Sequence, residues 1–152
     1  MTTMTDPLWG LPDPDLSPEF YADVPVKRLI AWGVDTILIA LICIAIIPFT
    51  AFTALFFLPA LFLVVGLVYR IATLAGRSAT PGMRLMAIEF RTRDGRRFDL
   101  GTAAVHTVLY TLSVSFVFPQ IVSVILMLTS ARAQGLSDHF LGTAALNRAA
   151  AS

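Results

Sequence analysis

Asp35 is the residue whose type and position most clearly indicate chemistry. It is the only formally charged side chain between Leu29 and Tyr69. A helix through this segment carries Asp35 about 10.5 Å inward from Arg28. An ionisable side chain at that depth in a bilayer is costly, so it should face protein or water and have a partner. Two roles stay open: cation or proton binding within the membrane, or a structural hydrogen bond to a hydroxyl of a neighbouring helix.

Arg28 and Asp138 are the other charged residues with a candidate role. Arg28 shares a helix face with Asp35, but helical side chains lean toward the N-terminus, so Arg28 points away into the interface. It is placed there to meet an acid from elsewhere in the chain, and Asp138 is the candidate partner. Plainer roles also remain open: an interface anchor for Arg28 and a helix cap for Asp138.

The remaining titratable residues do not form a catalytic set. His106 lies early in an uncharged segment, where it can relay protons or be satisfied by a hydroxyl or carbonyl. With His139 it makes too small a set for a metal site. We find no nucleophile–base pair and no paired catalytic carboxylates. We therefore expect no enzyme, no metal and no cofactor.

The composition places these residues in a membrane protein. Hydrophobic residues make up 57% of the chain and charged residues only 14%, against about 25% in a typical soluble domain. We predict an all-α membrane protein with a helical hairpin, a further kinked or paired membrane segment and a small cytoplasmic β-hairpin. The predicted parts are a disordered cytoplasmic tail over 1–25 and, within a membrane domain over 26–148, helices over 28–47 and 51–70, the β-hairpin over 83–100, a membrane segment over 101–131 and a short C-terminal segment over 136–148.

The helical hairpin follows from two apolar runs separated by Pro48–Thr50. Each run has the length of a membrane span of about 20 residues. A connection this short makes the two helices antiparallel. Pro59 is expected to kink the second helix because it removes a backbone hydrogen bond.

The later segments are predicted from alternation and length. Apolar and polar residues roughly alternate after Met83, and Asp94-Gly95 predicts a type I′ turn, so we expect a β-hairpin on the bilayer surface. The uncharged segment 101–131 is too long for one straight span. It forms either one helix kinked at Pro119 or two short helices.

The distribution of basic residues predicts the orientation. The connection at 48–50 has no lysine or arginine, whereas 71–100 is rich in arginine. The positive-inside rule therefore places 71–100 and the N-terminus in the cytoplasm. The net charge of +1 gives no reason to expect a nucleic acid. The arginines expected to meet anionic lipid headgroups are Arg77, Arg84, Arg91 and Arg93.

Four pieces of the sequence, in this order and spacing, resemble the RDD family of small bacterial membrane proteins. The pieces are Val26–Asp35, Gly76–Ile88, Asp94-Gly95 and Leu136–Thr143. The resemblance covers about residues 20–148. It implies that Arg28, Asp35 and Asp138 are the arginine and two aspartates for which the family is named. It also implies a location in the bacterial cytoplasmic membrane.

The resemblance further implies that the C-terminal segment lies near the arginine-rich segment, in the cytoplasm. That arrangement favours two short helices over 101–131 and four membrane passes. Two residues depart from the family pattern. Met83 stands where lysine is common, and His106 stands where arginine often occurs. These departures put in doubt an anion or headgroup contact at those positions.

Two functions are expected from these observations. The first is a small transporter or an ion or proton exchanger, in which Asp35 binds the ion and Arg28 and Asp138 form a cytoplasmic gate. A single small chain encloses little volume, so this function predicts a homo-oligomer or a partner membrane protein. The alternative is a non-catalytic scaffold or adaptor that binds a partner or anionic lipid on its cytoplasmic face.

Overall fold

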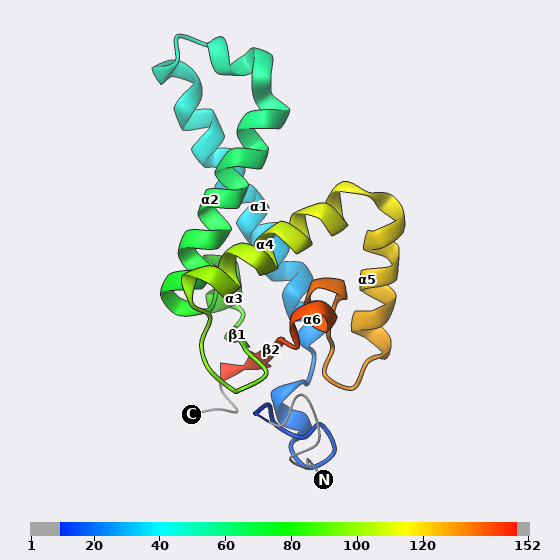
Figure 1. The fold of residues 1–152 in the computed structure, drawn as a ribbon. Helices are drawn as coiled ribbons and strands as arrows, with labels where there is room; N and C mark the ends of the chain where they lie inside the picture. Colours follow the sequence, from blue (N-terminus) through cyan, green and yellow to red (C-terminus); the bar gives the residue numbers. More distant parts are fainter. Residues whose placement is uncertain (1–9, 149–152) are drawn as a thin grey trace.

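The structure is a computed structural model that describes residues 10–148 (Figure 1). It consists mainly of helices, and the predicted all-α membrane fold class is confirmed. In chain order the elements are the 3-10 helix η1 (Pro18–Phe20), α1 (Val24–Phe49), the 3-10 helix η2 (Thr53–Phe57), α2 (Leu58–Arg77), α3 (Pro81–Leu85), β1 (Ile88–Arg91), α4 (Leu100–Ser115), α5 (Val117–Thr129), α6 (Leu136–Leu141) and β2 (Ala144–Asn147).

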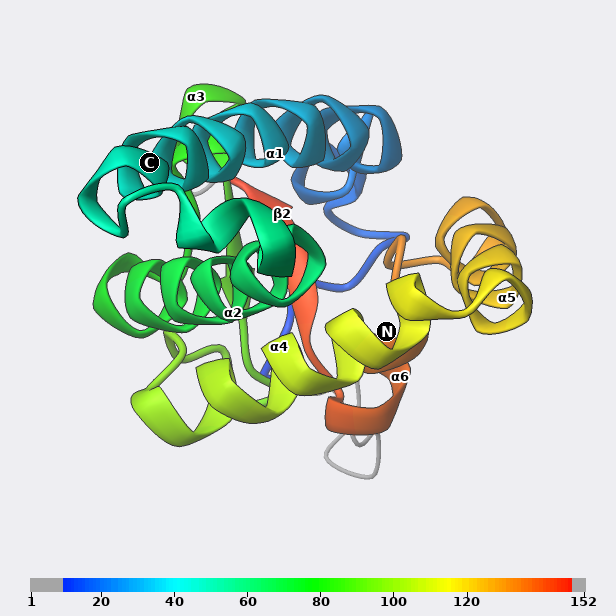
Figure 2. The ribbon, with the colours of Figure 1, turned by 90° about the horizontal axis from the view of Figure 1, so that it is seen from above.

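Helices α1 and α2 form the predicted antiparallel hairpin, whose far half extends away from the other elements (Figure 1). Both helices are long and apolar enough to cross a membrane. Seen from above, α2 lies between α1 and α4 (Figure 2). We call residues 40–65, the far half of this pair, the outer hairpin.

Pro59 does not kink α2, contrary to the expectation from the sequence. The α-helix begins at Leu58, so Pro59 occupies its first turn. N–H groups of the first turn have no partner within the helix, so the missing N–H costs nothing there. Pro25 and Pro81 occupy the same place in α1 and α3. The residues before Pro59, Thr53–Phe57, form η2 instead.

The uncharged segment forms two short helices, α4 and α5, bent by 115°. The break lies at Phe116, whose backbone is extended, and Pro119 again falls in the first turn of a helix. With 16 and 13 residues, these helices reach only about 24 and 20 Å, short of a hydrocarbon core of about 30 Å. By length and composition the described chain has two spans, or three if the bent pair is one span. The expectation of four passes is therefore wrong on this criterion.

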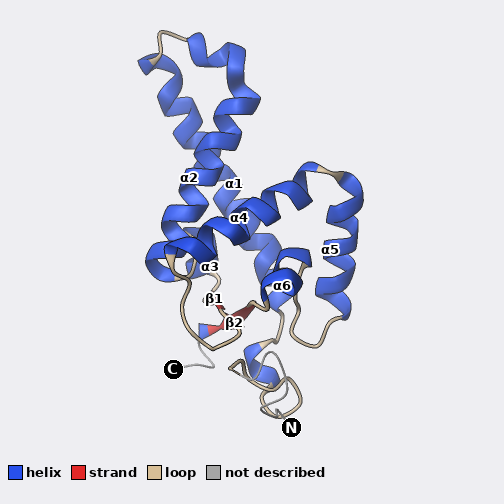
Figure 3. Cartoon of the chain, viewed as in Figure 1, coloured by secondary structure: helices blue, strands red, loops and turns tan. Residues whose placement is uncertain are grey.

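The β-hairpin predicted over 83–100 has a different partner strand. Only β1 forms in this segment, and it pairs antiparallel with β2, with Ile88 opposite Asn147 (Figure 3). A turn does form here, closed by the Gly95 amide on the Thr92 carbonyl, with Gly95 at φ +78°. It is not the predicted type I′ turn, because Asp94 lacks the positive φ that this turn type requires. β2 is the better partner because its apolar residues, Ala144–Leu146, become fully or almost fully buried by the pairing.

The segment that follows the Asp94-Gly95 turn does not form a strand. Arg96 and Arg97 are exposed, and the Phe98 amide donates to Ser78 Oγ at 2.9 Å. Ser78 Oγ in turn donates to the Phe90 carbonyl. A side chain from the end of α2 therefore takes the place of the predicted strand pairing.

The segment before α1 is not disordered where it is described. Leu11 and Tyr21 are 3% and 7% exposed and pack against β2. The apolar side chains between the prolines thus pack against β2, and amino-acid composition alone does not predict this contact. The rest of the predicted disordered tail, residues 1–9, lies outside the described residues.

The other elements pack around the near end of the hairpin and form what we call the base: α3, β1, β2, α4, α6 and the adjoining ends of α1 and α2 (Figure 1). Because β2 returns to β1, the C-terminal segment lies beside the arginine-rich segment. The apolar core of the base brings together residues far apart in the sequence: Val24, Ala31, Leu74, Met83, Ile88, Phe90, Phe98, Ala103, Ala133 and Ala145.

Candidate functional site

The three candidate residues fall into two clusters within the base. Asp138 and Arg28 are joined directly, with Arg28 Nη1 2.6 Å from Asp138 Oδ2. Asp35 lies two turns farther along α1 and has different partners. Both acids are fully buried, at 0% and 1% exposure. The question for function is therefore what each carboxyl is bound to.

The Asp35 cluster consists of Asp35, Tyr69, Thr80 and Gly82. The Tyr69 hydroxyl donates to Asp35 Oδ1 at 2.7 Å, and the Gly82 amide donates to the same oxygen at 2.8 Å. The Thr80 hydroxyl donates to Oδ2 at 2.5 Å. All three donors come from outside α1, so this one acid fastens α1 to α2 and α3.

The turn that begins α3 has the local structure needed to reach Asp35. Thr80 is the N-cap of α3, and its Oγ1 accepts from the Met83 amide at 3.3 Å while donating to the acid. Gly82 lies so close to α1 that a Cβ would be 2.3 Å from the Ala31 carbonyl oxygen. The sequence predicts this segment only as a turn. In the structure it brings the Thr80 hydroxyl and the Gly82 amide against the Asp35 carboxyl.

The Asp138 cluster consists of Asp138, Arg28, His106, Gly135 and Thr143. Oδ2 accepts from Arg28 Nη1 at 2.6 Å and from the Gly135 amide at 3.1 Å. Oδ1 accepts from His106 Nε2 and from the Thr143 hydroxyl, both at 2.7 Å. The His106 bond requires the ring hydrogen to be on Nε2. A carboxylate offers about four lone-pair sites, so Asp138 is saturated by its own chain.

The Asp138 carboxyl is held in its ionised form. Burial raises its pKa, but the positive charge of Arg28 and the hydrogen bond from His106 lower it by more. The pKa of Asp138 therefore lies well below its usual range. Arg28 and Asp138 form a buried salt bridge, and removing one partner of such a pair typically costs about 3–5 kcal/mol.

Two phenylalanines cover the Asp138 cluster. The Arg28 guanidinium lies 5.2 Å from the centre of the Phe90 ring. The His106 ring lies 4.5 Å from Phe90 and 5.4 Å from Phe98, between ring centres. Both phenylalanines are buried, so the charges interact through a medium of lower dielectric constant than water. Four elements (α1, β1, α4 and α6) thus meet at one ion pair.

A cavity of about 50 Å³ lies between the two clusters. Its walls include Arg28 and His106 from one cluster and Asp35 from the other. The buried hydroxyls of Thr107 and Tyr110 also line it, and neither forms a hydrogen bond of good geometry within the described residues. This volume accommodates a few water molecules, and nothing as large as an organic substrate.

The arginines predicted to meet lipid headgroups have different surroundings. Arg77 and Arg84 are exposed and form no ion pair within residues 10–148. Arg91 is half-buried and is held by Glu89 in an ion pair. Arg93 donates to a carbonyl oxygen of α6 at 3.3 Å. In the same described range, no group of three or more His, Cys, Asp and Glu side chains is placed to hold a metal ion.

His106 has a larger role than the sequence predicts. The predicted partner of its ring is a hydroxyl or carbonyl, whereas in the structure the ring donates to the Asp138 carboxylate. An anion contact at this position is therefore made by histidine in place of arginine. Met83, the other departure from the family pattern, is 6% exposed within the core. The donors Tyr69 and Thr143 gave no signal in the sequence, because an isolated hydroxyl has no distinctive spacing.

Comparison with known proteins agrees with the resemblance in the sequence. A family model described as the RDD family matches residues 23–142, which include Arg28, Asp35 and Asp138. The match ends just before β2. No curated protein and no solved structure matches the chain. Since the family match spans most of the sequence, the chain belongs to the RDD family.

Proposed function

We propose that this chain is a non-catalytic scaffold of the bacterial cytoplasmic membrane. The α1–α2 hairpin holds it in the bilayer, and the base presents a cytoplasmic face that binds anionic lipid headgroups. The arginine and two aspartates of the family signature keep the base folded onto the hairpin. In this proposal they are structural connections between elements, and no ion passes along them.

The observation that carries the proposal is that both buried carboxyls are held by hydrogen bonds from within the chain. Asp138 accepts four hydrogen bonds and Asp35 accepts three, all from the chain itself. Each buried donor that loses its acceptor costs about 1–3 kcal/mol. A carboxyl that exchanged ions would have to give up these bonds in every cycle. The geometry therefore favours a fixed role over a transport role.

Charge supports a cytoplasmic base. Residues 71–100 carry six arginines, and β1 within this segment pairs with the C-terminal strand β2. The opposite end of the hairpin, residues 48–57, has no charged side chain. Under the positive-inside rule the base, the described N-terminal segment and β2 then share the cytoplasmic side. Arg77 and Arg84 are the exposed cations on which we place the headgroup contact, at about 1 kcal/mol each.

The outer hairpin is where we place a second copy or a partner membrane protein. Its large apolar side chains are exposed, including Leu41 at 55% and Ile44 at 61%. Lipid can cover them in part, and another helix can pack on the same surface by van der Waals contact. The base, in contrast, has its own buried core.

A second candidate function, proton or sodium exchange through Asp35, is favoured by one observation. The cavity of about 50 Å³ touches Asp35 and is lined by two hydroxyls without good hydrogen bonds. Such groups can hold water beside an acid. Exchange would still require a path from this cavity to both faces of the membrane.

The variant Asp35→Asn separates the two functions. Asparagine keeps an oxygen for Tyr69 and Gly82, and its amide can donate to the Thr80 hydroxyl, so the fold should survive without an ionisable group. We expect vesicles with the wild type and with Asp35→Asn to show the same proton movement as empty vesicles, under a sodium or pH gradient, by an entrapped pH-sensitive dye.

Asp35→Ala is the matched control for the structural role. It leaves three donors without an acceptor, so we expect a lower midpoint of thermal unfolding in detergent than for Asp35→Asn. Gradient-driven proton movement that is present in the wild type and absent in Asp35→Asn would instead establish exchange and exclude the scaffold proposal.

A further inference from the structure

We propose that this chain binds one phospholipid molecule in a lateral groove between α1, α2 and α4, with the lipid phosphate on Arg70. This site is distinct from the exposed Arg77 and Arg84 and from both aspartate clusters. It does not depend on the scaffold role, because either a scaffold or an exchanger can hold a bound lipid.

The groove has the size and the chemistry for an acyl chain. It encloses about 430 Å³ and is lined by Ile39 of α1, Leu63 and Leu67 of α2, and Val114 of α4. The α1 and α2 walls belong to the two helices that are long and apolar enough to cross a bilayer. Gly66 leaves the middle of the groove unfilled, since a Cβ there would meet only Ile39 Cδ1, at 3.9 Å. Hydrocarbon is therefore the expected content.

Arg70 forms the polar end of this groove. It lines both the groove and the cavity beside Asp35. Its guanidinium lies 4.5 Å from the centre of the Tyr110 ring. Unlike Arg28, it forms no ion pair within residues 10–148. A guanidinium about 10.5 Å inside the end of α2 calls for a nearby anion.

The residues around Arg70 are those of a bilayer interface. Trp32 and Tyr110 line both the groove and the cavity, and Tyr69 precedes Arg70 on α2. Tryptophan and tyrosine concentrate at the depth of lipid headgroups. Trp32 lies near the Tyr110 hydroxyl, and no hydrogen bond of good geometry joins the two. That hydroxyl is free to donate to a phosphate oxygen.

A cation at one end of an apolar groove fits an anionic amphiphile. A guanidinium binds a phosphate diester through two parallel N–H···O bonds. A soluble anion would pair with Arg70 but would leave the apolar groove unfilled. A helix of a second copy would fill the groove but would leave Arg70 without an anion. A membrane phospholipid satisfies both ends and is present wherever the hairpin is inserted.

Lipid binding can be measured by native mass spectrometry of the full chain in a phosphate-free detergent, titrated with phosphatidylglycerol. We expect Arg70→Gln to weaken binding about tenfold, the loss of one charge-assisted contact. Arg97→Gln removes an exposed arginine that lies outside the groove and should have little effect. Gly66→Phe fills the groove and should abolish binding, whereas Gly66→Ala should retain it.

Four results would overturn the proposal. Equal losses for Arg70→Gln and Arg97→Gln would indicate a diffuse basic surface. Retention of lipid by Gly66→Phe would show that the groove is not the site, and this arm decides the matter even if Arg70→Gln does not fold. Binding of glycerol phosphate as tight as that of the lipid, or loss of a dimer in place of a lipid in Gly66→Phe, would assign a different occupant.

Discussion

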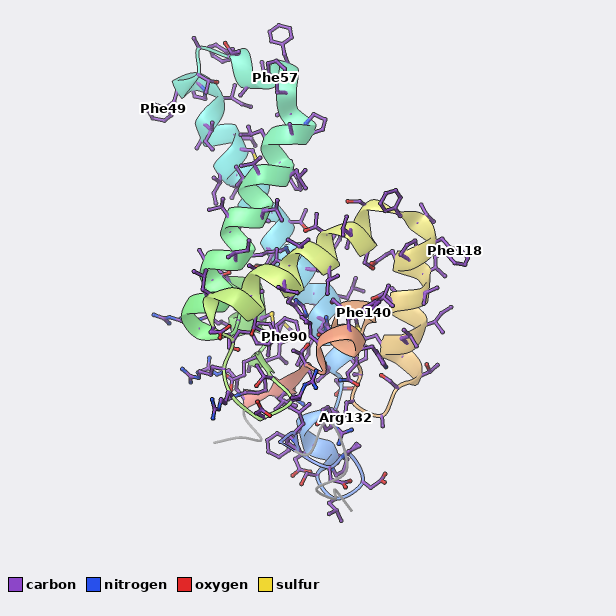
Figure 4. All side chains as sticks on the ribbon, viewed as in Figure 1. Phe49, Phe57, Phe90, Phe118, Arg132 and Phe140 are labelled. Atoms are coloured by element: carbon purple, nitrogen blue, oxygen red, sulfur yellow. The ribbon has the colours of Figure 1, made fainter. Side chains whose placement is uncertain are left out.

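The outer hairpin and the base of this molecule are held together by different forces. In residues 40–65 the side-chain hydrogen bonds are local, made by Thr50 to its own turn. Phe49 and Phe57 point outward at the far end, whereas Phe90 lies inside the base (Figure 4). In the base, two buried carboxyls accept seven hydrogen bonds from five elements and their flanking turns.

One chain is therefore adapted to two surroundings. The outer hairpin satisfies its backbone within each helix and leaves its side chains to hydrocarbon. The base has short elements that cannot stand alone, and α3 has only five residues. Buried polar contacts between elements therefore hold the base together, whereas the outer hairpin is stabilised by the backbone hydrogen bonds within its two long helices. Substitutions should therefore separate the two regions.

Asp138→Ala should have the largest effect. It leaves the buried Arg28 charge, His106 and two further donors without an acceptor, so we expect a loss of at least about 3–5 kcal/mol. The yield of monodisperse protein in detergent and the midpoint of thermal unfolding measure this loss. Phe140→Ala, on the same helix but 69% exposed, is the control and should behave as the wild type. Equal yields and equal unfolding midpoints for the two variants would show that the Asp138 cluster does not stabilise the base.

Gly82→Ala should destabilise the base by forcing α3 away from α1. The added Cβ would lie 2.3 Å from the Ala31 carbonyl oxygen and 2.9 Å from Asp35 Oδ1. We expect a loss of about 1–3 kcal/mol, as for other overpacked sites. Gly76→Ala is the control, because a Cβ there meets nothing within 4 Å and alanine favours the helix. A lower unfolding midpoint for Gly76→Ala than for Gly82→Ala would contradict the close approach.

Acid should weaken the base through Asp138. The folded-state pKa of this carboxyl lies below its unfolded value, which is about 3.9. Its contribution to stability is therefore complete above that pH and is lost as the pH falls further. We expect the unfolding midpoint of the wild type to stay level above about pH 5 and to fall as the pH is lowered below about pH 4. The fall should be smaller in Asp138→Asn, and an equal fall in both proteins would exclude this cause.

Ile44→Ala should have the smallest effect. The side chain is 61% exposed on the outer hairpin, so in detergent we expect a change within about 0.5 kcal/mol. The same truncation at Ile88, which is 0% exposed in the base, should cost about 2–5 kcal/mol. Similar unfolding midpoints for Ile44→Ala and Ile88→Ala would mean that the two regions do not differ as described.

The same division explains how much of the fold the sequence predicts. The outer hairpin follows from composition, since two apolar runs with a short connection allow one arrangement. In the base, β1 and the Asp94-Gly95 turn are predictable, but the pairing of Ile88 with Asn147 is not. That pairing joins residues far apart in the chain, and local alternation contains no information about a distant partner. The break at Phe116 in place of Pro119 likewise depends on where α5 begins.

The candidate site was predictable in its acids and in Arg28, and not in its other donors. Asp35 and Asp138 stand out because charge is rare in an apolar chain, and Arg28 is marked by its position at the membrane edge. The residues that bind them, such as Thr80 and His106, are ordinary turn and helix residues by local sequence. Their role appears only when α3 is packed against α1 and α4 against α6.

A double-mutant cycle between Arg28 and Asp138 tests most directly the claim that polar contacts fasten the base to the hairpin. A reciprocal exchange of the two residues is unsuitable, because an arginine at 138 cannot accept from His106 or Thr143. Arg28→Met, Asp138→Asn and the double variant are instead unfolded reversibly in mixed micelles with sodium dodecyl sulfate. We predict a coupling of about 1–3 kcal/mol between the two sites. Additive losses in the free energy of unfolding, with no coupling, would show that the contact between Arg28 and Asp138 does not fasten the base to the hairpin.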